Sequence, residues 1–408
     1  MTKKEPTISR RTFLKTGTSA LAGAAMLSSS ACSPQSKEKT QPNDAKLVHR
    51  TLGRTGLRLP VVSMGACYGI DLVRSALDNG IVYIHTSADY AERNHERLLG
   101  RVFENRPRDS FVVGTSPELP YEFKGRGPSA DLGTKVDPGL ISESIEGSLE
   151  RLKLDFVDLY YLGSIGRPET LLHETYIDAF EKLKRDGKVR FIGITTHENE
   201  PPVIRAAADC GAWDIVLTSY NFRQSHREEM EAAIQYAADA GLGIVGMKTQ
   251  AGVYWDRGRT KKINMKAALK WALQNQNIHT TVPAFASFEE MEEDIDVMRD
   301  LTMTPEEIRD LALGDELGFS GHYCQQCGTC LEQCPAGMDI PTLMRCYMYA
   351  FGHRQPRKAR GTLRHWTSAD VLCATCDGCE VTCSLGFDVQ SRAVEISRIL
   401  EIPEAFLG

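Results

Sequence analysis

The sequence lacks three features that would each point to a class of protein. It has no run of eighteen or more apolar residues, which excludes a membrane-spanning helix in the usual sense. It has no strong basic stripe in its folded part, and its 48 Lys and Arg against 54 Asp and Glu give a net charge of −6, which argues against a nucleic-acid partner. No Gly-rich turn follows the first expected strand, as it would in a doubly wound dinucleotide fold.

Cysteine, by contrast, is abundant and unevenly placed. Eight of the twelve cysteines lie between residues 324 and 383, and the other four are Cys32, Cys67, Cys210 and Cys346. The rest of the composition, 42% hydrophobic and 25% charged over 408 residues, is typical of a globular chain with two or three domains. The clustered cysteines therefore need an explanation of their own.

The N-terminus has the pattern of a targeting segment. Residues 9–15 read "SRRTFLK" and precede the small-residue stretch "TSALAGAAML", which resembles a twin-arginine export signal read by a receptor. We expect a signal peptide over 1–31 and a polar, flexible linker over 32–46. Cleavage after Ala31 and lipidation of Cys32 as a membrane anchor are both open. Either outcome places the protein in the periplasm or cell envelope.

From residue 47, apolar runs alternate with amphipathic patterns. Strands are expected at 59–65, 82–87, 111–115, 156–162, 190–195, 214–219, 243–248 and 280–284. Helices are expected at about 71–79 and at 93–105, 138–153, 172–186, 201–210, 225–240, 265–276 and 287–299. Apolar strands between helices indicate a parallel sheet covered on both faces, and eight such units over roughly 250 residues predict an α/β fold, a (β/α)₈ TIM barrel, over 47–303. A doubly wound sheet is the alternative.

Polar residues follow several of these strands. In a barrel, catalytic groups lie at the carboxyl ends of the strands. Candidates at such positions are His85, Tyr90, His197, Tyr220, Asn221 and Lys248. A lysine there can hold an anionic substrate group or, once desolvated, act as a base. The alternative is that these residues are polar lining or a solvated lysine without a catalytic role.

Several segments resemble a known family in pattern and order. "HRTLGRTGLRLPVVSMG" (49–65) resembles the opening hairpin and first strand of aldo/keto reductases, and "NGIVYIHTSADYAERNHERLLG" (79–100) resembles their second strand and the helix after it. The later segments "DFVDLYYL", "GKVRFIGITTH", "SYNF" and "GIVGMK" resemble their fourth to seventh strands. The resemblance runs from about residue 47 to 300.

The resemblance implies carbonyl reduction by NADPH with a tetrad of Asp, Tyr, Lys and His, of which one member is present. Tyr90 matches the tyrosine that protonates the substrate oxygen, but His85 stands at the aspartate position, Ser116 at the lysine position and Gly163 at the histidine position. An unperturbed phenol has a pKa of about 10 and is a slow acid at neutral pH. Since imidazole titrates at about 6.5, we expect His85 to be a replacement acid or base.

The resemblance leaves NADP(H) binding in question. The family has a glycine and then a cation for the 2′-phosphate after its eighth strand, but here Ala284 and Ala286 stand at those positions and a run of acidic residues follows. Ser287 and Glu290 have the capping-box spacing for the next helix, whose free N–H groups could bind an anion. The cofactor-binding candidates are Ser287, at the start of this helix, and Tyr220 and Asn221, which follow the sixth expected strand.

The cysteine array has a specific spacing. Residues 324–335 read "CQQCGTCLEQCP" and 373–383 read "CATCDGCEVTC", both C-x₂-C-x₂-C-x₃-C, which is the spacing of a [4Fe–4S] ferredoxin run. Because the fourth cysteine of such a run usually reaches the other cluster, one cluster is expected on Cys324, Cys327, Cys330 and Cys383, and the other on Cys373, Cys376, Cys379 and Cys334. Structural zinc and disulfides are the alternatives.

These runs predict a small, mainly helical ferredoxin-like domain with two clusters over 323–408. "TPEEIRDL" has the pattern of a helix start capped by Thr304, with Pro305 first and Glu307 closing the box, so 304–322 is expected to be a connecting helix. The basic stretch 353–365, "HRQPRKARGTLRH", is expected to be a solvated connector or a loop that docks on an acidic surface.

Together these features favour an exported iron–sulfur oxidoreductase. It would act on a small carbonyl or hydroxy compound, with electrons passing through two [4Fe–4S] clusters to or from a redox partner protein. Two alternatives stay open: an NADPH-dependent aldo/keto reductase with Tyr90 as acid, and a non-enzymatic barrel that serves as a binding or electron-transfer module.

Overall fold

The structure is a computed structural model that describes residues 46–407 except 92, 120–136, 257–259, 318–322 and 364–366. The expected export signal, Cys32 and nearly all of the expected linker lie outside the described residues. Within the described residues, every helix is too short or too polar to cross a bilayer.

The strands form a hairpin and a parallel sheet. β1 (His49–Thr51) and β2 (Arg58–Pro60) pair in antiparallel fashion. The parallel sheet of the described residues contains, in chain order, β3 (Tyr83–His85), β4 (Val112–Thr115), β5 (Val157–Leu162), β6 (Val189–Thr196), β7 (Ile215–Ser219), β8 (Gly243–Met247) and β9 (Thr280–Thr281). Each of these strands pairs with the next one along the chain, which is the order of a barrel wall.

A short segment closes this sheet. Val62 makes a parallel bridge to Thr281 of β9, and Met64 makes one to Ile84 of β3. The predicted (β/α)₈ barrel is therefore confirmed, but the expected first strand over 59–65 is split. Its first residues, Leu59 and Pro60, belong to the hairpin strand β2.

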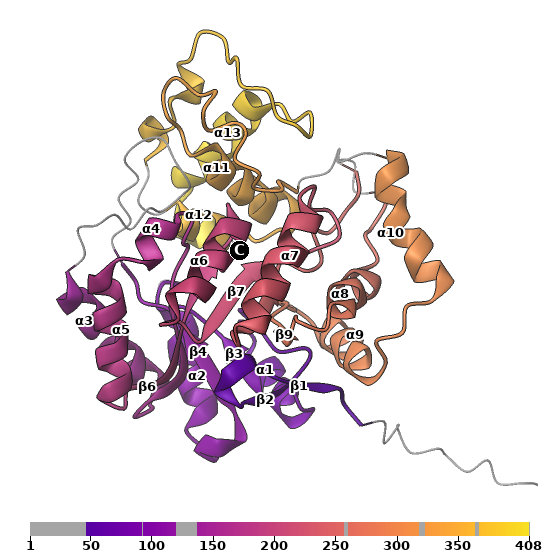
Figure 1. The fold of residues 1–408 in the computed structure, drawn as a ribbon. Helices are drawn as coiled ribbons and strands as arrows, with labels where there is room; N and C mark the ends of the chain where they lie inside the picture. Colours follow the sequence, from indigo (N-terminus) through magenta and orange to yellow (C-terminus); the bar gives the residue numbers. More distant parts are fainter. Residues whose placement is uncertain are drawn as a thin grey trace, which may run out of the picture. The chain divides into compact units, whose positions relative to one another are not determined.

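Helices follow the strands and cover the barrel from outside, as Figure 1 shows. They are α1 (Ile70–Asp78), α2 (Asn94–Phe103), α3 (Pro138–Leu152), α4 (Pro168–Leu171), α5 (Glu174–Arg185), α6 (Glu200–Cys210), α7 (Arg227–Asp239), α8 (Met265–Gln274) and α9 (Phe288–Arg299). The helix expected over 172–186 starts two residues later, because the His173 side chain accepts a hydrogen bond from the Thr175 amide and caps α5 there.

Two apolar layers hold the barrel together. The interior is filled by side chains of β2, β3, β5, β7 and β8, with the hydroxyls of Tyr83 and Tyr161 2.9 Å apart. A larger cluster fills the space between the outer faces of the strands and the helices. Both layers follow from strands that are apolar on both faces.

A buried carboxylate ties three strands together near their amino ends. Asp158, at the second position of β5, has no exposed surface and accepts hydrogen bonds from Arg108 and Arg190, each at 2.7 Å. It also accepts one from the Val113 amide at 2.9 Å. This end of a barrel usually serves stability rather than catalysis.

Replacing Asp158 with Asn should therefore lower the free energy of unfolding by about 2–3 kcal/mol, since both arginines lose their counter-charge. The matched control is Asp186→Asn, which removes an exposed partner of Lys182 and should cost no more than about 0.5 kcal/mol. Urea unfolding followed by circular dichroism measures both. Equal costs for the two variants would contradict the assignment.

The chain after α9 is mainly helical where the structure describes it. Its helices are α10 (Pro305–Leu317), α11 (Ile340–Tyr347), the π-helical turn Met348–Gly352, α12 (Pro356–Thr362) and α13 (Val389–Ser397). Short 3₁₀ turns lie at Gly53–Thr55, Arg108–Ser110, Ser368–Asp370, Leu372–Ala374, Arg398–Leu400 and Glu404–Phe406. The capping box at Thr304 is confirmed: its amide donates to the Glu307 carboxylate (2.8 Å) and its hydroxyl accepts from the Glu307 amide (3.1 Å).

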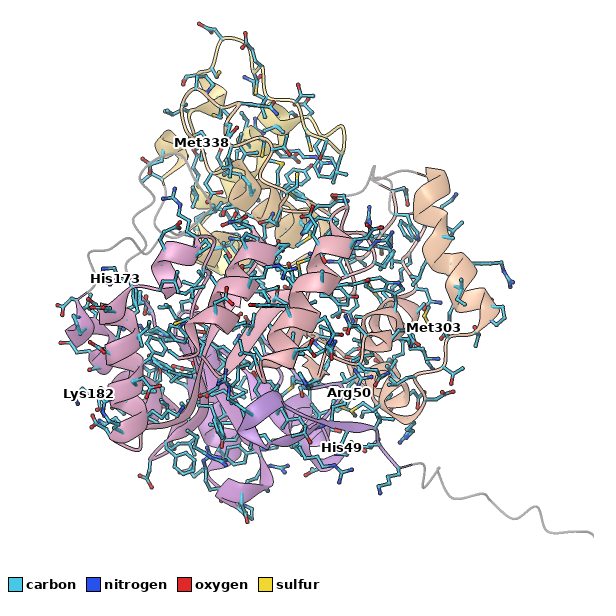
Figure 2. The ribbon with its side chains drawn as sticks, viewed as in Figure 1. His49, Arg50, His173, Lys182, Met303 and Met338 are labelled. Carbon is cyan, nitrogen blue, oxygen red and sulfur yellow. The ribbon has the colours of Figure 1, made fainter. Side chains whose placement is uncertain are left out.

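The C-terminal region has an apolar core of its own and contacts the barrel. The core gathers around α11 and α13 and includes Met338, which Figure 2 labels. At the junction, Asn221 donates a hydrogen bond to the Tyr323 hydroxyl (2.7 Å), and the Gln325 amide group donates one to the carbonyl of Arg223 (2.6 Å). These bonds attach the start of the C-terminal region to the loop after β7.

Candidate functional site

A cavity of about 800 Å³ lies at the carboxyl ends of the barrel strands. Its floor includes residues at or just after those ends: His85, Tyr90, Ser116, Gly163 and His197. Its walls include residues of α2 such as Leu98 and Arg101, residues between 342 and 362, and Leu407. The barrel and the C-terminal region therefore build one cavity together, of a size that suits a small-molecule ligand.

His85 and Tyr90 lie on the same side of this floor. Their ring centroids are 6.4 Å apart, and the His85 ring is 5.3 Å from that of Tyr161. Among the described residues, His85 Nδ1 has no hydrogen-bond partner. Burial, with a smaller contribution from His95, lowers the pKa of His85 to about 3. His85 is therefore neutral at physiological pH, and the expectation that it titrates near neutrality is wrong because the ring is desolvated.

His197 and Lys248 lie at the ends of two further strands. Burial and then the charge of Lys248 hold the pKa of His197 well below its ordinary value. The Lys248 ammonium is shielded from solvent and has no hydrogen-bond partner among the described residues. Burial, followed by the charges of Arg345 and Lys358, holds its pKa well below its ordinary value. A solvated surface lysine is therefore excluded at this position.

The three cofactor-binding candidates do not line the cavity. The Asn221 side chain is engaged with Tyr323, and the Tyr220 hydroxyl donates to the Glu231 carboxylate (3.1 Å). The Ser287 hydroxyl accepts from the Glu290 amide (3.3 Å) and caps α9. Each of the three therefore makes a hydrogen bond within the protein. Of the residues at the start of α9, Ala286 lines the cavity.

The cavity wall contributed by the C-terminal region was not predicted. Arg345 on α11 and Lys358 on α12 both line it. The expectation of a solvated connector or a docking loop over 353–365 is wrong for residues 356–362, because they form α12 and pack against the mouth of the barrel. The basic composition of that stretch was the only available signal.

The first group of thiols lies around a smaller cavity. Cys324, Cys327, Cys330 and Cys383 all line it, together with apolar side chains of α11. Burial, and then the neighbouring thiols of Cys324, Cys327 and Cys383, raise the pKa of Cys330. Cys383 of the second run thus lies with the first three cysteines of the first run.

The second group mirrors the first. Burial, and then the neighbouring thiols of Cys334, Cys379 and Cys376, raise the pKa of Cys373 to about 11. All eleven cysteines of the described residues are free thiols. Within the described residues, no three His, Cys, Asp or Glu side chains converge on one point as ligands of a single metal ion must. A cubane does not require this, since each of its irons takes one thiolate.

Comparison with known proteins shows which family and which proteins the barrel is similar to. Residues 63–267 match the sequence profile of the aldo/keto reductase family. L-galactose dehydrogenase of Arabidopsis thaliana is 27% identical over 306 residues, which cover 63% of this chain and 89% of that protein. An uncharacterized oxidoreductase of Bacillus subtilis is 29% identical over 219 residues, 49% of this chain and 66% of that protein.

A solved structure is similar in fold. The holo form of an aldo-keto reductase from Bacillus halodurans superimposes with a TM-score of 0.53 at 21% identity, over 69% of this chain and 99% of the other. At this identity the likeness concerns the fold.

Proposed function

Because the chain belongs to the aldo/keto reductase family and is an oxidoreductase, we propose that it exchanges electrons with a small carbonyl or hydroxy compound through two [4Fe–4S] clusters. The observation that carries the proposal is the grouping of eight thiols into two sets of four, in which each run contributes its fourth cysteine to the other set. That grouping is what two adjacent ferredoxin-type clusters need.

The residues around the thiols fit such a group. Cys324, Cys327, Cys330 and Cys383 would hold one cluster, and Cys373, Cys376, Cys379 and Cys334 the other. Ile340, Pro341 and Met344 line the first thiol cavity and give it an apolar side. When bound, each cluster supplies or accepts one electron at a time, and a carbonyl becomes an alcohol with two electrons and two protons.

Helix α11 links this group to the substrate cavity. Pro341 and Met344 line the cavity of the first thiol group, whereas Thr342 and Arg345 line the large cavity. One helix therefore contacts both cavities, which supports a short path for electrons between them.

At the barrel floor, Tyr90 and His85 handle the substrate oxygen. The Tyr90 hydroxyl would give it a proton, as the matching tyrosine does in the family. Neutral His85, whose Nδ1 has no partner among the described residues, can hold the same oxygen by a hydrogen bond. Ser116 and Gly163 line the cavity without supplying an amine or an imidazole, so the family's usual tuning of the tyrosine is missing.

NADPH is the weaker choice of electron carrier. The start of α9, where the family holds the 2′-phosphate, has no cation, and its polar groups satisfy one another. The Ala286 amide donates to the Glu290 carboxylate (2.8 Å), and the Glu290 amide donates to the Ser287 hydroxyl. A phosphate would meet this carboxylate rather than free N–H groups.

One experiment tests the carrier and the location together. Cells are fractionated anaerobically, and iron, acid-labile sulfide and turnover are measured for the protein from each fraction. We expect protein from the periplasm or envelope, directed there by "SRRTFLK", with about eight irons per chain and activity that depends on a reduced viologen. Iron-free protein that turns over steadily with NADPH in the cytoplasmic fraction would overturn the proposal.

A further inference from the structure

We propose that the substrate of this cavity is a small organic anion, whose carboxylate or phosphate group is held by Arg345 and Lys358. The inference rests on the proposed function only in taking the cavity as the substrate site. It adds the chemical class of the compound, and it assigns part of its recognition to the C-terminal region.

The first support is the charge of the cavity wall. Its lining in the described residues includes six arginines and lysines but one carboxylate, that of Asp89. The cations are Arg101, Arg345, Arg354, Arg357, Lys358 and Arg360. Clefts lined by one sign of charge concentrate ligands of the opposite sign.

The second support is the way Arg345 is held. Its side chain is 8% exposed. Its guanidinium donates to the side-chain oxygens of Gln326 and Thr342, each at 3.1 Å, and both acceptors are neutral. In the described part of the chain it makes no ion pair. These bonds fix the orientation of the guanidinium without cancelling its charge. The charges of Glu198 and Asp339 also act on it, and an anion in the cavity would add to this compensation of a buried charge.

Lys358 is a second cation of this wall, and its charge is held in a similar way. Its ammonium lies 4.6 Å from the centre of the Tyr349 ring, and within the described residues it too makes no ion pair. Burial, and then the charge of Arg345, lower its pKa to about 8. The second cation is therefore close enough to Arg345 for mutual repulsion, which a bound anion would relieve.

Lys248 adds a buried cation from the barrel side, although it is not among the residues that line the cavity. Its shielded Nζ has no partner in the described residues, and of the charges acting on it those of Arg345 and Lys358 come first. Its backbone has a left-handed φ of 55° directly after β8, a conformation that costs free energy for a lysine. Its charge adds to the positive field around Arg345 and Lys358, while the charges of Glu200 and Glu198 act on it in the opposite sense.

The test is calorimetric titration of the full, cluster-loaded protein with four probes: pyruvate, its neutral amide, inorganic phosphate and NADP⁺. Pyruvate or phosphate should bind with a Kd below about 10 mM, and the amide should not bind. Pyruvate binding would identify the carboxylate as the recognised group, and phosphate binding alone would identify a phosphorylated compound. Absence of both, or binding of NADP⁺ alone, overturns the inference.

The variants Lys358→Gln and Arg345→Gln should each weaken anion binding at least tenfold. Lys182→Gln removes the same charge from the outer side of α5 (Figure 2), where the lysine pairs with Asp186, and should leave binding unchanged. Arg345 is buried, so Arg345→Gln could fail to fold. In that case Lys358→Gln alone tests the inference. Equal binding in Lys358→Gln and Lys182→Gln would overturn the inference.

Iron content separates this inference from the proposed function. Protein that binds pyruvate through these cations but contains no iron would keep the anion site and reject the clusters. Protein with full iron content and no anion binding would keep the clusters and reject the anion site.

Discussion

Cys327→Ala and Cys383→Ala should each remove about four of about eight irons, and the double variant should lose no more than either single variant. The reason is that both thiols line the same cavity although they belong to different cysteine runs. In contrast, the pair Cys327→Ala and Cys334→Ala should lose all the iron, because Cys334 lies with Cys373 in the other group.

Iron and sulfide analysis of anaerobic protein, with electron paramagnetic resonance of the reduced form, measures these losses. Cys346→Ala is the matched control, since Cys346 is a fully buried thiol of the same region that lies outside both groups. It should keep all the iron. If the pair Cys327→Ala and Cys334→Ala keeps half of the iron, each run holds its own cluster and the crossed assignment fails.

Tyr90→Phe should lower turnover at least 100-fold, the usual range for loss of a general acid. Tyr90 is the one member of the family's tetrad that remains, and it lines the cavity beside His85. Steady-state rates with a reduced viologen as donor give the comparison. Tyr68→Phe removes another hydroxyl from the same lining and should change the rate less than about threefold. Similar rates for both variants would show that Tyr90 is not the acid.

The pH profile gives a separate check on this floor. With its pKa lowered to about 3 by burial, His85 stays a neutral imidazole, with a single ring proton, between pH 5 and 8. We therefore expect His85→Gln to lower the rate, through loss of a hydrogen bond, without moving the profile. A rate decrease centred near pH 6.5 that disappears in His85→Gln would show that the histidine ionises during turnover.

The barrel could be predicted because its signal is local. Apolar strands alternate with amphipathic helices, and each pattern is visible within a short window. The ends of the elements were less accessible. The run over 59–65 is mostly apolar, so its pattern does not reveal that it is divided at Pro60 between hairpin and barrel wall. The same applies to the eighth expected strand, over 280–284. It corresponds to β9, which contains two residues and ends before Pro283.

The site could be predicted only where position within the fold decides. His85, Tyr90 and His197 follow strand ends, and the cavity includes all three. The residues of α11 and α12 that line the cavity could not be predicted, since no sequence pattern indicates which surface a distant short helix will cover. The shielding of Lys248 has the same origin, because it depends on elements far along the chain.

The hydrogen bond between Arg345 and Gln326 has a consequence for maturation. Gln326 lies between Cys324 and Cys327, and its side chain also donates to the carbonyl of Pro341. If the proposed clusters form, assembly of the first one would brace the segment that carries Gln326, and with it one of the two bonds that orient the guanidinium. An immature chain would then keep only the Thr342 bond and would capture its reactant less well.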